Sequence, residues 1–139
     1  MENSVSIFNR IYDKFMTKYY EENHQLAAQH SLSARDEYYL DLIYTMPEPT
    51  SSKFAQKAQI SKAAATQIMT KFIELGYVIK TPSKEDKRVI DLRLSSEMKA
   101  YFAASYQLMA ELYDQSLTFL TDIEKRQLDQ ILRKIDRNL

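Results

Sequence analysis

Gly76, the only glycine in this chain, separates a short helical pattern from a hairpin pattern, and this junction limits the folds that the chain can adopt. A glycine just past a helix end takes the left-handed conformation that a Cβ atom would penalise. Two strand-like runs follow, Tyr77–Thr81 and Val89–Leu94, and the loop between them is mostly charged. We therefore predict a helix followed directly by a β-hairpin with a charged tip.

The second strand-like run must lie against other elements. Its apolar residues Ile90, Leu92 and Leu94 occupy alternate positions, which is the pattern of a strand with one buried face. A hairpin of two strands alone is marginally stable in water. We therefore expect these three side chains to be buried against helices.

Two short helices with a tight turn between them are predicted before Gly76. Residues 50–52, all Ser or Thr, offer N-caps for the first helix, and Ser61 offers one for the second. The apolar positions are Phe54, Ala55 and Ala58 in the first helix and Ala65, Ile68, Met69, Phe72 and Leu75 in the second. This order is typical of a helix-turn-helix.

Longer helices are predicted before this segment. Apolar residues spaced by three and four positions predict an amphipathic helix of about twenty residues near the N-terminus. Its stripe is Val5, Phe8, Tyr12, Phe15 and Tyr19. The next helix should begin after Ser33, with Asp36 completing the cap, and should end at Met46 before Pro47.

Two helices are also predicted after the hairpin. The first begins at Ser95 or Ser96 and runs to about Phe119, and a capping box of Thr121 and Glu124 opens the last. The last helix carries the apolar stripe Ile123, Leu128, Ile131, Leu132, Ile135 and Leu139. The expected fold is mostly α with a small β-hairpin wing: a winged helix-turn-helix with long N- and C-terminal helices, in a single domain over residues 1–139.

The zero net charge of the chain conceals a basic middle. Residues 53–93 carry nine basic and four acidic side chains, whereas residues 1–52 carry four and eight, and residues 94–139 carry six and seven. A run of charge is often only a solvated face. Here it coincides with a helix that fits the major groove and a hairpin tip that reaches the backbone or minor groove, so it favours double-stranded DNA as the partner.

Several other classes of protein are disfavoured. The chain has no Cys, which excludes disulfides and thiolate metal sites. No run approaches the roughly 18 apolar residues of a membrane span, and no signal peptide is evident, so we expect a cytoplasmic protein without a membrane partner. A single glycine and no nucleophile elbow argue against an enzyme, and no cofactor is expected.

The two histidines form a weak set of metal ligands. His24 and His30 are six residues apart, on different faces of a helix, and Glu21 and Glu22 lie near the first of them. Two His without Cys rarely hold zinc. We expect no metal site, and we expect both histidines to lie on the surface.

Three motifs around the hairpin, together with the order of the helices, resemble the multiple-antibiotic-resistance regulator (MarR) family of winged-helix transcriptional regulators. The motifs are Gly76-Tyr77-Val78-Ile79, the D-x-R of Asp86 to Arg88 within residues 82–88, and Leu92-Arg93-Leu94-Ser95. The resemblance covers essentially the whole chain. It implies a DNA-binding lobe at about residues 33–95 and a homodimer held by helices at about residues 4–28 and 96–139. It also implies a repressor that binds a palindromic operator and is released by a small molecule.

The residues expected to contact DNA lie on one helix and at the hairpin tip: Ser61, Lys62, Ala63, Thr66, Gln67, Thr70, Lys71, Lys84, Asp86, Lys87 and Arg88. Gln67 can pair bidentately with adenine, and Thr66 can pack on a thymine methyl. Lys62 and Lys71 suit phosphates. The resemblance places Arg88 at the minor groove or its phosphates, and we expect Asp86 to orient it through a charge-assisted hydrogen bond.

The sequence leaves open the role of one group of side chains and one alternative function. One set of aromatic and Met side chains is either ordinary core or the lining of a pocket for a small hydrophobic or aromatic effector: Tyr12, Met16, Tyr19, Tyr38, Tyr39, Met46 and Met109. The alternative function is a winged-helix module for protein–protein interaction without operator binding. The basic middle argues against that alternative, because interface cores are depleted of Lys.

Overall fold

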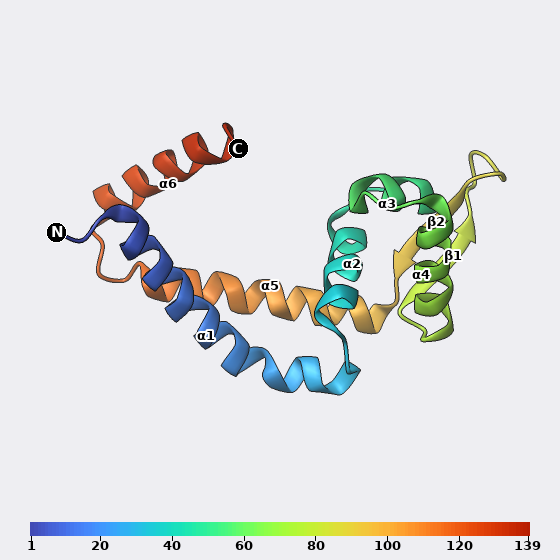
Figure 1. Cartoon of the computed structure of the whole chain (residues 1–139), viewed down its shortest axis with the longest axis horizontal. Helices are drawn as coiled ribbons and strands as arrows, with labels where there is room; N and C mark the ends of the chain where they lie inside the picture. Colours follow the sequence, from blue (N-terminus) through green and yellow to red (C-terminus); the bar gives the residue numbers. More distant parts are fainter. The chain divides into compact units, whose positions relative to one another are not determined.

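The computed structural model describes the backbone of residues 1–139 and the side chains of residues 1–23 and 30–139. Six helices and one hairpin confirm the predicted fold class (Figure 1). They are α1 (Ser4–His30), α2 (Ala34–Thr45), α3 (Ser51–Ala58), α4 (Lys62–Glu74), β1 (Val78–Pro82), β2 (Ile90–Leu94), α5 (Ser96–Ser116) and α6 (Asp122–Asp136).

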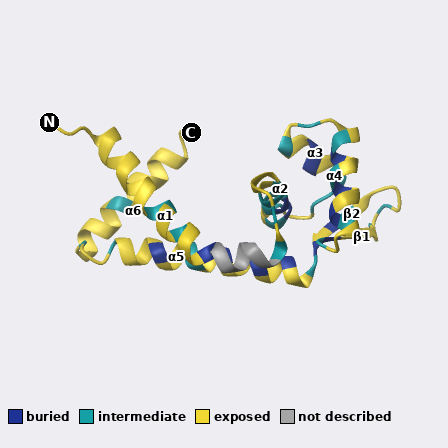
Figure 2. Ribbon diagram, turned by 60° about the horizontal axis from the view of Figure 1, so that its bottom comes forward, coloured by how far each residue is buried: buried dark blue, intermediate teal, exposed yellow. Residues whose placement is uncertain are grey.

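The chain forms two compact units. The hairpin unit is residues 24–105, and the terminal-helix unit is residues 1–23 together with residues 106–139. In the hairpin unit, α2, α3, α4 and both strands pack around one core (Figure 2). Leu40 of α2, Phe54 of α3 and Phe72 of α4 are fully buried there. The same core receives Val78 and Leu94 from the hairpin, so the hairpin is fixed to the helix-turn-helix by apolar packing.

The helices of this unit begin where the sequence predicts. Ser33, Thr50 and Ser61 each accept a hydrogen bond from the backbone N–H three residues later, at 3.1, 3.2 and 3.1 Å. Such caps satisfy backbone donors that have no partner within the helix. Gly76 has φ +76°, which confirms the left-handed position past α4. The turn between α3 and α4 uses a second left-handed residue, Gln59, with φ 56°.

The hairpin is antiparallel, with Val78 opposite Leu94 and Pro82 opposite Ile90. Each strand begins one residue later than predicted. Leu92 and Leu94 are buried as expected, but the expectation for Ile90 was wrong, because its side chain is 45% exposed. Ile90 pairs with the last residue of β1 at the tip end of the hairpin, and the packed part of the sheet lies at the other end.

Two other expectations about apolar positions and helix ends were wrong. Leu75 is the C-cap of α4 and is 52% exposed, so it does not continue the buried stripe. Helix α5 ends at Ser116, because the backbone N–H groups of Leu117 and Thr118 bond to carbonyls three residues back. Phe119 therefore lies outside the helix.

His30 is not the surface histidine that we expected. Its side chain is only 9% exposed, and Nδ1 lies 3.5 Å from Oε1 of Glu97. The ring packs edge-on against Tyr77 and Tyr101, with centroids 6.4 and 5.5 Å apart. The hydroxyl of Tyr77 also donates to the His30 carbonyl at 2.9 Å. His24 lies outside the residues whose side chains are described.

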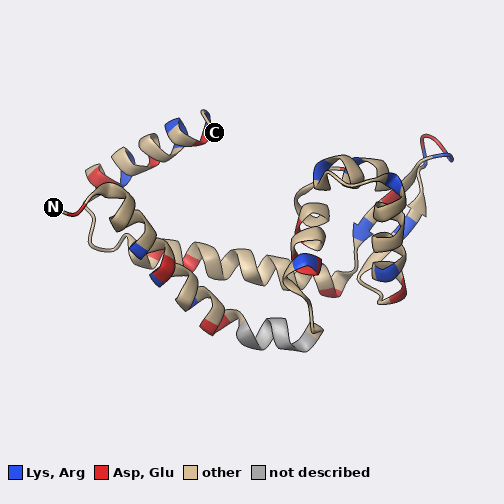
Figure 3. Cartoon of the chain, in the orientation of Figure 1, with Lys and Arg blue, Asp and Glu red and all other residues tan. Residues whose placement is uncertain are grey.

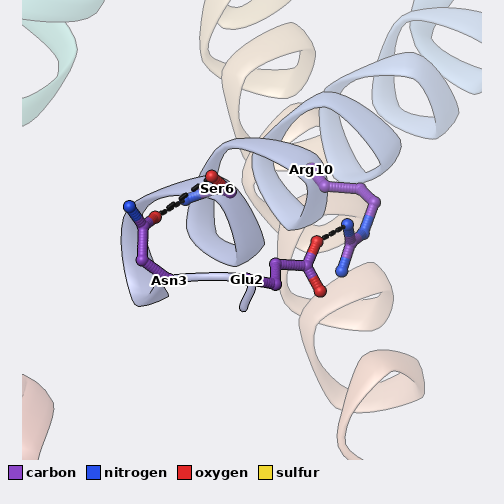
Figure 4. A network of polar contacts seen from close by, with 4 residues as sticks. All are labelled: Glu2, Asn3, Ser6 and Arg10. Atoms are coloured by element: carbon purple, nitrogen blue, oxygen red, sulfur yellow. Dashed lines mark hydrogen bonds and ion pairs between the residues drawn. The ribbon is translucent and has the colours of Figure 1, made fainter.

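The terminal-helix unit is built from the ends of the chain. Figure 4 shows Asn3 accepting hydrogen bonds from the backbone and hydroxyl of Ser6, at 2.9 and 3.0 Å, and an ion pair between Glu2 and Arg10. The predicted capping box of Thr121 and Glu124 forms at the start of α6. No residue of α6 is buried, so its apolar stripe is open to solvent.

Candidate nucleic-acid interface

Helix α4 presents a small polar face away from the core. Ala65, Met69 and Phe72 are buried on its inner side. The predicted contact residues Lys62, Ala63, Thr66, Gln67, Thr70 and Lys71 are all exposed. Ser61 is exposed as well, although its hydroxyl is used to cap the helix. The outer side of α4 therefore carries short side chains at its centre, which allow close approach to base edges, and lysines toward its ends.

The two threonines of this face are fixed by the helix backbone. The hydroxyl of Thr66 donates to the Lys62 carbonyl, and that of Thr70 donates to the Thr66 carbonyl, each at 2.9 Å. Because each hydroxyl proton is used within the helix, the side chain offers a methyl group and an acceptor outward. This geometry suits contact with a thymine methyl, the role predicted for Thr66.

Lys71, one of the predicted contact residues, is paired within the chain. Its ammonium lies 2.7 Å from Oδ2 of Asp36, in the first turn of α2. The phosphate contact expected of Lys71 stays a prediction. The two residues are 35 positions apart, so no local pattern could have paired them.

The hairpin loop is ordered by its own hydrogen bonds. Ser83 donates its backbone N–H to the Val89 carbonyl, and Val89 donates to the Asp86 carbonyl, both at 2.9 Å. Asp86 Oδ1 accepts from the backbone N–H of Arg88 at 3.0 Å and from its Nε at 3.3 Å. The predicted Asp86–Arg88 bond therefore forms. The Arg88 side chain is still 91% exposed, so its terminal nitrogens are free to meet a ligand.

A groove runs between this loop and the start of α3. It has a volume of about 840 Å³, and its charged lining residues are three basic side chains, Lys53, Lys84 and Arg88, and four acidic ones, Glu48, Glu85, Asp86 and Asp91. The segment before α3 closes one side, because the Leu92 N–H donates to the Pro49 carbonyl at 2.8 Å. Figure 3 shows Lys and Arg along α3, α4 and the hairpin. The basic residues predicted from the sequence thus gather on elements that pack together.

The residues predicted for an effector pocket fall into both units. Tyr38, Tyr39 and Met46 belong to the hairpin unit, and Tyr12, Met16, Tyr19 and Met109 belong to the terminal-helix unit. The ring of Tyr39 packs edge-on against Phe54, with centroids 5.5 Å apart, so Tyr39 is part of the core packing. Tyr12 and Tyr38 are more than half exposed. The effector pocket stays a prediction.

The described residues form neither a metal site nor a membrane span. Within them, no group of three His, Asp or Glu side chains is arranged to hold a metal ion. None of the helices in this part of the chain is long and apolar enough to cross a bilayer.

Comparison with known proteins gives one family. Residues 32–90 match the model of the MarR family. These residues include α2, α3, α4 and the hairpin loop, which are the elements of the candidate interface. No curated protein sequence matches the chain.

Solved structures share the fold of essentially the whole chain at low sequence identity. A mutant of MepR from multidrug-resistant S. aureus has a TM-score of 0.69 and 16% identity, and the match covers 99% of each chain. The S. aureus MepR–DNA complex has a TM-score of 0.61 and 14% identity over 100% of each chain. YusO from Bacillus subtilis has a TM-score of 0.62 and 18% identity, over 99% of this chain and 100% of YusO.

Proposed function

We propose that this chain, whose residues 32–90 match the MarR family model, is a homodimeric transcriptional repressor that binds a palindromic operator. In this proposal α4 enters the major groove, and the hairpin tip reaches the adjacent minor groove or backbone. A small hydrophobic or aromatic effector would release the protein from DNA.

One observation carries the proposal more than any other. The exposed polar face of α4 and the 91%-exposed Arg88 belong to a single packed unit, so the helix and the wing are held together before DNA arrives. Preorganised contacts lose little freedom on binding. The similarity to a regulator solved with DNA supports the same partner.

The dimer is supported by the terminal-helix unit. Ile131, Leu132 and Ile135 of α6 are 56, 42 and 51% exposed, although their spacing places them on one face of the helix. Val5 and Phe8 of α1 are also more than 60% exposed. A second copy would remove this apolar surface from water, and two copies related by a two-fold axis suit a palindromic site.

The proposal also includes repression of transcription and its release by an effector. A dimer seated on an operator near a promoter excludes polymerase without needing any further activity. Release requires an effector that binds the DNA-free conformation more tightly than the DNA-bound conformation.

Duplex binding should weaken steeply as salt rises. With about three or four phosphate contacts per subunit, the slope of log affinity against log salt should be about −5 to −7 for the dimer. Fluorescence anisotropy with a long mixed-sequence duplex measures this slope without knowledge of the operator. A slope near zero would contradict the proposal and favour a protein–protein module.

A further inference from the structure

We propose that Asp36 competes with DNA phosphate for Lys71 and so limits the affinity of this protein for any duplex. The proposal rests on the proposed function, because it concerns the same face of α4. It assigns a role to a carboxylate that lies outside the helix-turn-helix and the wing.

In the pair of Asp36 and Lys71, the carboxylate is held in place and the lysine is able to move. Asp36 is in the first turn of α2, its side chain is 18% exposed, and its backbone N–H donates to the capping Ser33 at 3.1 Å. The positive end of α2 stabilises its negative charge. Lys71 is 53% exposed and carries its ammonium on a flexible four-carbon stem. The lysine can therefore leave the pair, whereas the carboxylate must stay.

The position of Lys71 makes this competition relevant to DNA. Lys71 follows Gln67 by one helical turn, so it lies on the same side of α4, where phosphates flank the bases that Gln67 would contact. An ammonium at 2.7 Å from a carboxylate has its charge largely neutralised. A phosphate must therefore compete with Asp36 for the charge of Lys71, and the carboxylate remains close enough to the phosphate to repel it.

Asp36→Asn tests the proposal because it removes the charge and keeps the size of the side chain. The variant should bind a mixed-sequence duplex about 3–10-fold more tightly. The slope of log affinity against log salt should become steeper by about two for the dimer, because one phosphate contact per subunit is gained. Sequence preference should not change, since Lys71 does not read bases.

Two comparisons separate this effect from a general change in charge. Asp114→Asn, at an exposed position on α5, changes the net charge equally and should leave the slope unaltered. In a Lys71→Ala background, Asp36→Asn should gain much less than in the parent. Asp36→Ser provides a second neutral variant suited to a helix start, and thermal unfolding of each variant checks the fold.

The outcomes are distinct. If Asp36→Asn and Asp36→Ser fold normally and bind with the parent's affinity and slope, the proposal is overturned. Weaker binding would overturn it too, because Asp36 would then orient Lys71 toward DNA. A gain that persists in full without Lys71 would also overturn it, because the effect would then come from the carboxylate alone. A parent that binds no duplex would instead refute the proposed function.

Discussion

Replacing Arg88 by alanine should weaken duplex binding by about 1–3 kcal/mol per subunit, or about 2–6 kcal/mol for the dimer. The side chain is 91% exposed, while Asp86 holds its backbone N–H and Nε at 3.0 and 3.3 Å. The guanidinium is therefore presented in a nearly fixed position, and little freedom is lost when it meets a phosphate or the minor groove. The fold and the dimer should be unaffected, because an exposed charge contributes little to stability.

A variant of its neighbour Asp86 and a control on α6 define the role of this arginine. Asp86→Ala should produce a smaller loss in the same direction, because Arg88 remains but is poorly oriented. Arg126→Ala removes the same charge from an exposed position on α6 and should have little effect on binding. Titrations by fluorescence anisotropy measure all three. Parental affinity in Arg88→Ala would show that the wing does not contact DNA, and tighter binding by Asp86→Ala would refute the orienting role.

Ile131→Glu should convert the protein to a monomer at micromolar concentration. Ile131 is 56% exposed in the single chain, so a carboxylate there costs the fold little. In a dimer that covers the stripe of α6, each subunit would bury one unpaired charge, at a cost of about 3–5 kcal/mol. The dimer dissociation constant should rise at least about 100-fold, and binding to a two-fold operator should fall with it.

Sedimentation measures this change, and a neighbouring residue supplies the control. Gln130→Glu introduces the same charge one residue earlier, on the side of α6 away from Leu128, Leu132 and Ile135, and should stay dimeric. If Ile131→Glu remained a dimer, α6 would lie outside the interface. A parent that is already monomeric would refute the homodimer.

The features that could be predicted from the sequence are those governed by local chemistry. A hydroxyl next to an apolar helical pattern predicts a cap, and Ser33, Ser61 and Thr121 all form one. The single glycine marks the left-handed residue after α4, since other residues adopt that conformation at a cost. The bond between Asp86 and Arg88 was also predictable, because the two residues are two positions apart in one loop.

The features that could not be predicted depend on contacts between distant segments. The pairing of Lys71 with Asp36 joins two helices that the sequence separates by 35 positions. The side chain of His30 is largely covered because Tyr77 at the hairpin junction and Tyr101 of α5 pack against its ring. The alternation of apolar residues along β2 predicted that Ile90 is buried. Alternation shows which face of the strand a side chain lies on, but it does not show how much of that face the helices cover.

Selection of bound sequences from a random duplex pool tests the central claim most directly. We expect an inverted repeat with half-sites about one helical turn, or about 10 base pairs, apart. We also expect that Gln67→Ala, selected in parallel, loses preference at one base position in each half-site, by about 1–3 kcal/mol. Recovery of no enriched sequence, or of a site without two-fold symmetry, would contradict operator binding by a symmetric dimer.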